Sequence, residues 1–312
     1  MNEFYKKILK NRATRRKILM VFDWVPDKIM LKIQYRLKLG RKLNLNNPLR
    51  YTEKLQWCKL YYKNPILAQC VDKYEVREYV KSKNLGGILN ECYGVYNTVE
   101  DIDFDSLPDK FVAKHTLGGG GNDVVICEDK KKLDMQQLRL RFNDWLTRKT
   151  SKGGREWPYH AGGKPRIIIE RLIEVPPNEE GGLKDYKFLC FNGKPQYIVY
   201  DTDRYTGHKR NIYDLDWNDL HIKTDCPCCG KEINPPLNLK EMIKTAAILS
   251  ADFPAVRVDL YSVGERIYFG ELTFFPWSGY VQFEPDKFDF TLGEAFVLPG
   301  DDISRREVKQ HA

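Results

Sequence analysis

The chain has 312 residues, of which 42% are hydrophobic and 12% aromatic, and this is enough for one large core or for two to three smaller ones. It contains no run of 18 apolar residues, which excludes a membrane-spanning helix, and its N-terminus lacks the apolar stretch of a signal peptide. We therefore expect a cytoplasmic protein. Its eight cysteines are scattered along the chain, which favours reduced thiols over a disulfide framework.

The net charge of +8 is concentrated in residues 1–42, which hold 13 Lys and Arg residues against three acidic residues. Apolar residues recur there at helical spacing and predict a basic amphipathic arm over residues 1–44. Such an arm can bind an anionic bilayer surface, here the inner face of the membrane, or it can be solvated and packed on the rest of the protein. No base-reading motif accompanies the charge, so we expect no nucleic-acid partner.

The next part of the chain, residues 45–108, is predicted to be mainly helical. The spacing of apolar residues predicts a helix over 52–62, with Leu55, Cys58 or Lys59, and Tyr62 on one face. A second helix is predicted over 72–83. Thr52 and Asp72 are the residues that we expect to cap the two N-termini.

Strand patterns begin near residue 109. Two strands are predicted over 110–115 and 123–128, with a glycine-rich turn between them. A helix over 134–148 and a mobile, glycine-rich loop over 149–164 follow.

Further strands are predicted over 165–174, 185–191 and 195–203. A helix begins near Asn238, where Asn238 and Glu241 match a capping box. A hairpin over 256–272 is closed by Gly264, and the charged residues 301–312 are expected to form a disordered tail.

The glycine-rich turn, Gly118–Gly121, follows Lys114 at the end of a predicted strand. Backbone N–H groups in such a turn can form a nest that binds a phosphate. The turn matches neither a Walker P-loop nor a dinucleotide fingerprint. A phosphate site and an ordinary flexible hairpin turn are both compatible with this pattern.

The hairpin near the C-terminus combines charged and apolar residues. Alternation places Arg257, Asp259 and Tyr261 on one face of its first strand, and Phe269, Glu271 and Thr273 on one face of its second. Carboxylates that meet on paired strands are suitable ligands for Mg²⁺. A network of salt bridges on the strand surface is the alternative.

Three cysteines, Cys226, Cys228 and Cys229, are crowded into one loop. A structural zinc site normally takes four ligands from two spaced pairs. His221 or Cys190 would have to complete such a site, so we favour ordinary loop thiols over zinc.

Several motifs together resemble the ATP-grasp superfamily, and more closely its TupA-like branch, which occurs among bacterial surface-polysaccharide and teichuronopeptide genes. The resemblance covers roughly residues 45–300. The motifs that carry it are YTEKLQWCKLYY, DKYEVREYV, LPDKFVAKH, DYKFLCFNGKP, VRVDLY and YFGELTFFPWSG. Thr273 stands where many members of the superfamily have Asn, although the branch itself often has Thr.

The resemblance implies an α+β protein with the ATP-grasp fold, in which two α+β lobes grip ATP after a mainly helical N-terminal region. The expected segments are the arm 1–44, the helical region 45–108, a lobe with the glycine-rich loop over 109–173, a lobe with the metal site over 174–300, and the tail 301–312.

The resemblance also implies roles for individual residues. Arg257 and Lys114 would be catalytic, and Asp259, Glu271 and Thr273 would hold one or two Mg²⁺ ions. The nucleotide would contact a set of lysines, glycines and strand-end residues: Lys73, Lys114, Gly118, Gly119, Gly120, Gly121, Glu170, Arg171, Leu172, Ile173 and Lys187. The acceptor would contact Arg204, His208, Arg210, Ser278 and Gly279, although a solvated loop explains the first three equally well.

The activity implied is an ATP-dependent, ADP-forming carboxylate–amine ligase that forms an amide through an acylphosphate. Its substrates would be a saccharide carboxylate, such as a uronic acid of a bacterial capsule, and a small amine. A sugar phosphotransferase, a glycosyltransferase and a non-enzymatic scaffold are the alternatives.

Overall fold

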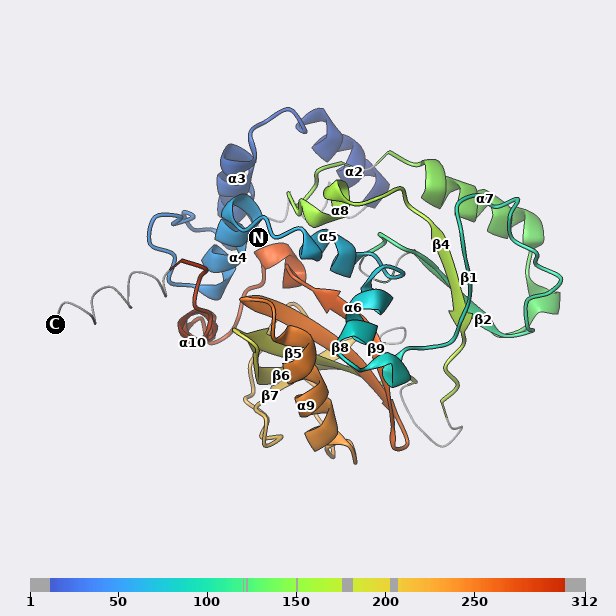
Figure 1. Ribbon diagram of the computed structural model, residues 1–312. Helices are drawn as coiled ribbons and strands as arrows, with labels where there is room; N and C mark the ends of the chain where they lie inside the picture. The colour runs from blue at the N-terminus through green and yellow to red at the C-terminus, as the bar shows by residue number, and fades with distance from the viewer. Residues whose placement is uncertain are drawn as a thin grey trace. The chain divides into compact units, whose positions relative to one another are not determined.

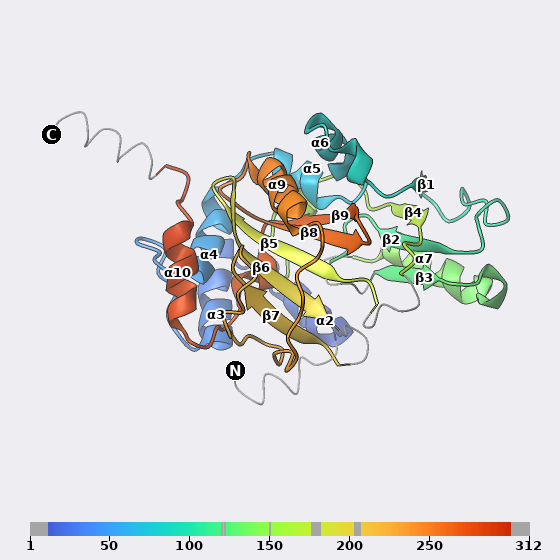
Figure 2. The ribbon, with the colours of Figure 1, turned by 90° about the horizontal axis from the view of Figure 1, so that it is seen from below.

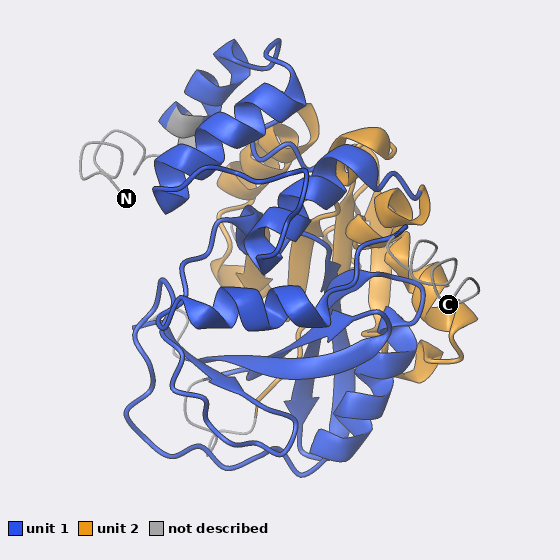
Figure 3. Cartoon of the chain, turned by 90° about the vertical axis from the view of Figure 1, so that its left-hand side faces the viewer, with its two compact units in different colours: residues 1–64, 151–157, 180–312 blue, residues 65–150, 158–179 orange. Residues whose placement is uncertain are grey.

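The computed structural model describes residues 12–119, 121, 123–149, 151–175, 182–202 and 207–300. The chain forms two compact units, which Figure 3 distinguishes by colour: unit 1 contains residues 1–64, 151–157 and 180–312, and unit 2 contains residues 65–150 and 158–179. The predictions for residues 1–11 and for the tail 301–312 lie outside the described residues.

Unit 2 has an antiparallel four-stranded sheet with the order β1-β4-β2-β3 (Figure 1). Its elements are α5 (Ile66–Val71), α6 (Val76–Ser82), η1 (Gly86–Ile88), β1 (Cys92–Tyr96), β2 (Phe111–His115), β3 (Val124–Cys127), η2 (Lys130–Lys132), α7 (Met135–Thr147), α8 (Pro158–Ala161) and β4 (Ile167–Arg171).

The core of unit 2 lies between α7 and the sheet. Leu138, Phe142 and Trp145, spaced along one side of α7, are buried in a cluster with Phe111 of β2 and Ile169 of β4. The N-terminus of α7 is fixed by Asp134, whose side chain accepts a hydrogen bond from the amide of Gln137. The hairpin of β2 and β3 and the helix α7 confirm the sequence predictions for this region.

Unit 1 has an antiparallel five-stranded sheet with the order β7-β6-β5-β8-β9, seen from below in Figure 2. Its elements are α2 (Arg12–Val21), α3 (Asp27–Leu39), α4 (Tyr51–Tyr61), β5 (Asp185–Phe191), β6 (Lys194–Thr202), β7 (Lys209–Tyr213), α9 (Leu239–Ser250), β8 (Ala255–Val263), β9 (Arg266–Thr273), η3 (Pro276–Gly279) and α10 (Lys287–Ala295).

Helix α9 covers one face of this sheet. Its residues Met242, Ala246 and Leu249 are fully buried, and Cys190 of β5 points toward α9, with its thiol 4.0 Å from the carbonyl oxygen of Ala246. Because side chains alternate along a strand, the neighbours of Cys190 at odd spacing lie on the other face of β5. That other face carries the charged residues of the site.

Helix α4 begins one residue earlier than predicted, and its cap is different. Glu53 accepts hydrogen bonds from the amides of Leu49 and Arg50, so Glu53 does occupy the N3 position of a capping interaction. Thr52 does not cap the helix, because its hydroxyl donates to Asp289 of α10 at 2.8 Å. Leu55, Cys58 and Lys59 are buried on the inner face, as predicted, whereas Tyr62 is the C-cap residue and lies outside α4.

Of the two other residues predicted to cap helices, one caps a turn and the other forms no cap. Asp72 accepts from the amides of Tyr74 and Glu75, but it caps a turn and the helix itself begins at Val76. Asn238 precedes α9, but its side chain makes no cap and contacts Ser262 and the carbonyl oxygen of Glu265 instead.

The division into units differs from the segments expected from the sequence. The expected helical region 45–108 is split at residue 64, since α5, α6 and β1 belong to the unit that contains β2 and β4. The expected loop 149–164 contains α8, and its residues 151–157 belong to unit 1. Within that stretch Arg155 is buried.

Candidate active site

Three charged side chains form one row across the sheet of unit 1. Lys187 of β5 is paired with Asp259 of β8, and Asp259 is paired with Glu271 of β9. Residues paired across antiparallel strands point to the same face. The row therefore places a lysine and two carboxylates side by side, as the alternation in the hairpin predicted for Asp259 and Glu271.

A bulge in β9 sets which residues share this face. Leu260 is paired with Phe269, and Asp259 with Glu271, so Gly270 is the extra residue. A Cβ atom at Gly270 would lie 2.9 Å from the carbonyl oxygen of Asp259, which explains the need for glycine there. The prediction that Phe269 shares a face with Glu271 is therefore wrong: Phe269 is paired with Leu260 and lies on the opposite face.

Arg257 connects the acidic residues of the row. Its Nε and NH2 atoms lie 2.7 Å from the two carboxylate oxygens of Asp259, and NH2 is 3.1 Å from Oε1 of Glu271. NH2 also donates to the hydroxyl of Thr273 at 3.1 Å, and that hydroxyl donates to Glu271. All four residues predicted for the metal and catalytic roles in this unit are thus brought together.

Burial and the neighbouring charges shift the pKa values of these residues in opposite directions. Burial raises the pKa of Asp259, although Arg257 and Lys187 lower it. For Arg257 burial lowers the pKa, but the carboxylate of Asp259 outweighs this effect and the net shift is upward. The guanidinium therefore stays charged, and it compensates the buried carboxylate beside it.

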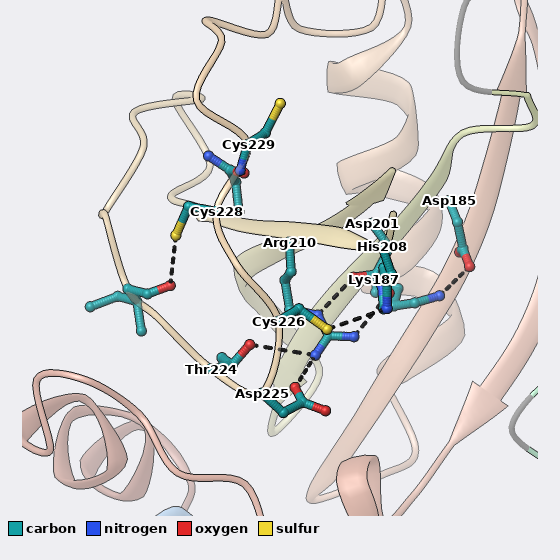
Figure 4. A network of polar contacts seen from close by, with 12 residues as sticks. Asp185, Lys187, Asp201, His208, Arg210, Thr224, Asp225, Cys226, Cys228 and Cys229 are labelled. Carbon is teal, nitrogen blue, oxygen red and sulfur yellow. Dashed lines mark hydrogen bonds and ion pairs between the residues drawn. The ribbon is translucent and has the colours of Figure 1, made fainter. Parts of the chain in front are cut away.

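The charged face continues toward the other edge of the sheet. Asp185 of β5 is paired with Asp201 of β6, which is paired with Arg210 of β7. Lys187 also donates to Asp185 (Figure 4). The face therefore carries charged groups on all five strands, of which Lys187, Arg210, Asp259 and Glu271 were expected at the site.

Arg210, an expected acceptor contact, is held by carboxylates. Its Nε is 2.7 Å from Oδ1 of Asp201, and its NH1 is 2.6 Å from Oδ1 of Asp225 (Figure 4). Although burial raises the pKa of Asp201, the hydrogen bonds from Arg210 outweigh it and lower the pKa to about 2. The stretch around Arg210 is strand β7, not a solvated loop, and Arg210 stabilises it.

His208 lies beside this pair. Its Nε2 is 3.1 Å from Oδ1 of Asp201, and its Nδ1 is 3.3 Å from the thiol of Cys226. Its side chain is about one third exposed, so it remains more accessible than Arg210. Arg204 lies outside the described residues.

The oxygen ligands of the row are chemically suited to Mg²⁺. Mg²⁺ is usually bound by one or two carboxylates together with water and substrate phosphates, not by a complete protein cage. Asp259 and Glu271 supply two carboxylates, and the side chain of Glu271 is 41% exposed. Within the described ranges, no group of three or more His, Cys, Asp or Glu side chains is arranged to hold a metal ion. Phosphate oxygens would have to complete the coordination.

The cysteines proposed for zinc have separate surroundings. Cys226 contacts His208, the thiol of Cys228 is 3.9 Å from the carbonyl oxygen of Ile222, and Cys229 donates its amide to Asn211 (Figure 4). The two candidates for a fourth ligand do not join them, since Cys190 faces α9 and His221 pairs with Asp219 on the surface. The geometry does not favour a zinc site here.

Ser278 and Gly279 lie in a strained turn after β9. Trp277, Ser278 and Gly279 all have positive φ angles, of 52°, 55° and 67°. Lys59 of α4 donates to the carbonyl oxygen of Ser278 at 2.8 Å, and Gln56 donates to that of Gly279 at 2.9 Å. These two side chains hold the turn in place.

Lys59 is a residue whose role the sequence did not reveal. It is fully buried, and it also donates to the carbonyl oxygen of Gly154 at 2.8 Å. Burial lowers its pKa to about 8. Its position on the inner face of a predicted helix could have indicated this role, because a lysine that is buried there needs hydrogen-bond partners.

Unit 2 contains a second cluster of predicted residues. Nζ of Lys114 on β2 is 2.7 Å from Oε2 of Glu170 on β4, and NH1 of Arg77 on α6 is 3.1 Å from Oε1 of the same carboxylate. Glu170 is buried, whereas Lys114 is partly exposed. The ammonium group of Lys114 is thus held in place by Glu170 and is still partly exposed on the surface of unit 2.

The glycine-rich loop contacts the other predicted lysine. Nζ of Lys73 donates to the carbonyl oxygen of Gly118, and the amide of Lys73 donates to that of Thr116. A Cβ atom at Gly118 would lie 2.7 Å from Cβ of Asp123, and Gly121 has a φ angle of 71°. Both positions therefore require glycine for structural reasons, whereas a Cβ atom at Gly119 would meet nothing within 4 Å. Gly120 lies outside the described residues.

The expected adenine-binding stretch leaves the end of β4. Glu170 and Arg171 are its last strand residues, and Asn90 donates to the carbonyl oxygen of Arg171 at 2.7 Å. Leu172 and Ile173 follow and are half-buried. Within the described part of the chain, no hydrogen bond to their backbone groups is found. Those groups are available to pair with a planar heterocycle.

His115 and its neighbours were not predicted as part of this cluster. His115 is buried against Trp145, and burial lowers its pKa to about 4. Nearby, NH2 of Arg148 is 2.7 Å from Oδ2 of Asp123. These residues support the base of the glycine-rich loop, because the amide of Gly118 donates to the carbonyl oxygen of His115, and a Cβ atom at Gly118 would meet both His115 and Asp123.

Among solved structures, similar chains are found at low identity. D-alanine–D-alanine ligase from Bacillus anthracis is 19% identical, with a TM-score of 0.42, over 67% of this chain and 58% of that one. The same enzyme from Helicobacter pylori is 14% identical, with a TM-score of 0.43, over 79% and 69%. An N5-carboxyaminoimidazole ribonucleotide synthetase bound to ADP is 15% identical, with a TM-score of 0.42, over 74% and 52%. The chain thus spans less than two thirds of the length of two of these three proteins.

No curated protein sequence matches the chain. The model of one protein family, described as TupA-like ATPgrasp, matches residues 53–297, which is more than half of the chain and includes both clusters. The chain therefore belongs to the TupA-like ATP-grasp family.

Proposed function

We propose that this protein is an ATP-dependent carboxylate–amine ligase that forms an amide and releases ADP and phosphate. The observation that carries the proposal is the row formed by Lys187, Asp259 and Glu271, with Arg257 bonded to both carboxylates. Lys187 and Asp259 are almost fully buried, and burying charged groups costs free energy that a sheet with a purely structural role could avoid. The row is suited to a ligand that brings its own phosphates and cation.

In this proposal the unit 1 residues handle the phosphates. Asp259 and Glu271 would hold Mg²⁺, with Thr273 as a hydroxyl neighbour, and the bound ion would neutralise phosphate charge. Lys187 and Arg257 are cations that can move from carboxylate to phosphate oxygens. Arg257 has a guanidinium fork that matches the oxygens of a transferred phosphoryl group.

The unit 2 residues would bind the nucleotide. Lys114 and Lys73 supply positive charge, and the loop Gly118–Gly121 would offer backbone N–H groups to phosphate oxygens, apart from that of Gly118, which donates to the carbonyl oxygen of His115 at 3.1 Å. The backbone of Leu172 and Ile173 would pair with adenine, next to Glu170 and Arg171. Each of these assignments is part of the proposal.

The reaction proceeds in two steps. A carboxylate oxygen of the acceptor attacks the γ-phosphorus, the bond between this phosphorus and the β,γ-bridging oxygen breaks, and ADP leaves. An amine nitrogen then attacks the acyl carbon, the C–O bond to phosphate breaks with its electrons on the phosphate, and the nitrogen loses a proton. Positioning and charge stabilisation are the contributions that the protein makes.

For the acceptor we propose a saccharide carboxylate, such as a uronic acid of a bacterial surface polysaccharide, and for the nucleophile a small amine or amino acid. His208 is more accessible than Arg210, and Ser278 lies on the strained turn after β9. Arg210, held by Asp201 and Asp225, would shape this region without needing to touch the acceptor.

Product analysis tests the proposal. The protein is incubated with MgATP, a panel of uronic acids and a mixture of amino acids, and ADP, phosphate and amides are measured. ADP and phosphate that form when both the carboxylate and the amine are present support a ligase. ADP with a phosphorylated sugar and no free phosphate would show a phosphotransferase, and transfer from a nucleotide sugar without ATP would show a glycosyltransferase.

A pair of variants keeps this test specific. Glu271→Gln removes a carboxylate of the row, whereas Glu265→Gln changes an exposed residue of the turn between the same two strands. We expect Glu271→Gln to abolish ADP formation and Glu265→Gln to leave it unchanged. Equal activity of both variants with the wild-type protein would contradict the role of the row.

The reaction is proposed to take place beside a membrane. In the part of the chain that the structure describes, no helix is long and apolar enough to cross a bilayer. The basic residues near the N-terminus favour a peripheral contact with the inner face of the membrane.

A further inference from the structure

Helix α3 exposes two parallel stripes of side chains. Positions four apart lie on the same side of a helix, so residues at this spacing form a stripe along it. The apolar stripe is about half exposed and consists of Ile29 at 51%, Ile33 at 46% and Leu37 at 49%. The cationic stripe, which is also exposed, consists of Lys28, Lys32 and Arg36.

Helix α3 is firmly packed against the rest of unit 1, although its two stripes are exposed. The opposite side of α3 buries Leu31, Tyr35 and Leu39. Gln34 on that side donates to the carbonyl oxygen of Gly153 at 3.0 Å, and it accepts from the hydroxyl of Tyr280 at 2.7 Å. The orientation of the helix is therefore fixed, and the isoleucines face outward because the inner side is already packed.

Two acidic residues near the start of α3 have partners in the stretch 152–155. Asp27 is 3.1 Å from NH1 of the buried Arg155, and Asp23 accepts a hydrogen bond from the amide of Lys152 at 3.0 Å. Arg155 also donates to the carbonyl oxygen of Phe22 at 2.7 Å. The charge of Asp27, whose side chain is 42% exposed, is therefore partly neutralised by Arg155, and the exposed cations of the stripe outnumber it on α3.

The turn between α2 and α3 adds further apolar surface. Trp24 is 80% exposed, and Val21 and Phe22 are exposed as well. Tryptophan is enriched at membrane–water interfaces, where its ring lies at the level of the headgroups. Large apolar side chains gathered at one place on a surface usually mark an interaction site.

We propose that this α2–α3 face, formed by the two stripes, by Val21 at the end of α2 and by the turn residues Phe22 and Trp24, binds the surface of a bilayer that contains anionic lipids. The apolar stripe and Trp24 would enter the region between headgroups and acyl chains. The cationic stripe would lie against the lipid phosphates, and an amphipathic helix with this division is typical of helices that lie in the membrane plane.

Charge argues for this occupant over a second copy of the chain. A symmetric contact between two α3 helices through their apolar stripes would bring the adjoining cationic stripes close together. That juxtaposition costs free energy, whereas anionic headgroups neutralise the same charges. A nucleic acid would use the cationic stripe, but it would leave the isoleucines and Trp24 in water.

The proposal does not depend on the reaction that the protein catalyses. The α2–α3 face contains none of the residues of the two clusters, so binding to vesicles and turnover of ATP can be measured separately. If the protein does not bind vesicles, the proposed ligase activity still stands, and if it does not turn over ATP, the proposed membrane binding still stands.

Vesicle binding tests the proposal. The full-length protein is sedimented with vesicles of phosphatidylcholine and with vesicles of equal parts phosphatidylcholine and phosphatidylglycerol, each at low and at high ionic strength. We expect binding to the anionic vesicles, a loss of binding at high salt, and a blue shift of tryptophan fluorescence that is absent in Trp24→Ala.

Two triple variants separate the two stripes. Lys28, Lys32 and Arg36 are changed to Gln, or Ile29, Ile33 and Leu37 to Ser. Each basic residue near an anionic surface contributes about 1 kcal/mol, so the first change should weaken binding about 100-fold. The second should also reduce binding, because it removes the inserted apolar surface. Neither change should affect ATP turnover in solution.

Matched controls alter the same chemistry at other exposed positions. Lys131, Lys132 and Lys244 are changed to Gln, or Leu140, Leu237 and Ile248 to Ser. Control variants that lose binding as strongly as the stripe variants would overturn the proposal. The proposal would also fail if the wild-type protein bound neutral and anionic vesicles equally, bound neither, or formed a dimer that the apolar triple variant dissociates.

Discussion

Lys187 and Asp259 face each other across β5 and β8, with Nζ of the lysine 3.0 Å from Oδ2 of the aspartate. Both side chains are almost fully buried, and Arg257 binds the same carboxylate. Removing charges from water in this way is costly unless each one has a partner. The balance of charges in the row is therefore a condition for the stability of unit 1 as well as for the proposed binding of MgATP.

We predict that Asp259→Asn destabilises the protein and abolishes MgATP turnover. The amide has the size of the carboxylate but leaves Arg257 and Lys187 without its negative charge. Breaking a buried ion pair costs about 3 kcal/mol or more, and urea denaturation would measure this loss. Asp216→Asn, at an exposed position, is the control and should change neither property. An Asp259→Asn protein with wild-type stability would show that the row is not electrostatically coupled.

Two lysines near β2 allow a test of nucleotide binding. Lys114 is bonded to the buried Glu170, whereas Lys110 forms an exposed pair with Glu174. A hydrogen bond to a charged group contributes about 1.5–3 kcal/mol, so Lys114→Gln should weaken MgATP binding about 10- to 100-fold by calorimetry. Lys110→Gln, with the same change of charge, should have little effect. Equal losses would mean that general charge attraction explains the binding.

Much of the sheet in unit 1 could be predicted because strand alternation is a local property. The alternation of charged and apolar residues in β8 and β9 placed Asp259 and Glu271 on one face, and their register confirms this. The bulge at Gly270 displaced Phe269 from that face. Glycine is favoured at the bulge because a Cβ atom there would lie 2.9 Å from the carbonyl oxygen of Asp259, which belongs to the other strand.

Features that depend on distant residues could not be predicted in the same way. A solvated loop was one of two explanations for the basic residues Arg204, His208 and Arg210, but Arg210 lies in strand β7. Its burial depends on Asp201, which lies opposite Arg210 on β6. Thr52 failed as a cap because its hydroxyl bonds to Asp289, 237 positions away. Local patterns show that a charged residue needs a partner, but they do not identify it.

The glycine-rich loop gives a prediction based on two neighbouring positions. A Cβ atom at Gly118 would collide with Asp123, whereas one at Gly119 would meet nothing within 4 Å. Gly118→Ala should therefore destabilise unit 2 and shift the loop. Gly119→Ala should leave the stability unchanged and reduce ATP affinity if the phosphates approach its backbone closely. Thermal unfolding and nucleotide titration of both variants would measure these effects.

The reverse pattern would contradict the proposed role of the loop. If Gly119→Ala bound ATP as tightly as the wild-type protein, no phosphate would lie against that part of the backbone. If Gly118→Ala were as stable as the wild-type protein, the contact between the loop and Asp123 would not be a constraint.

His115 gives a prediction about pH. Burial lowers its pKa to about 4, from an ordinary value near 6.5, so the folded protein keeps it neutral. Between these two pH values the unfolded chain binds more protons than the folded chain. The free energy of unfolding should therefore be largest above pH 6.5 and should decrease as the pH falls toward 4, by about 3 kcal/mol in all.

Urea denaturation at several pH values would test this, with His115→Phe as the variant. Phenylalanine keeps a ring against Trp145 but cannot take up a proton, so the decrease over this pH range should be smaller than in the wild-type protein. His221→Asn is the control, because the side chain of His221 is 87% exposed and belongs to unit 1, whereas Trp145 and the glycine-rich loop belong to unit 2. If His115→Phe retained the full decrease, other groups would have to account for it. If it lost the decrease, the neutral His115 beneath the glycine-rich loop would link the stability of unit 2 to pH.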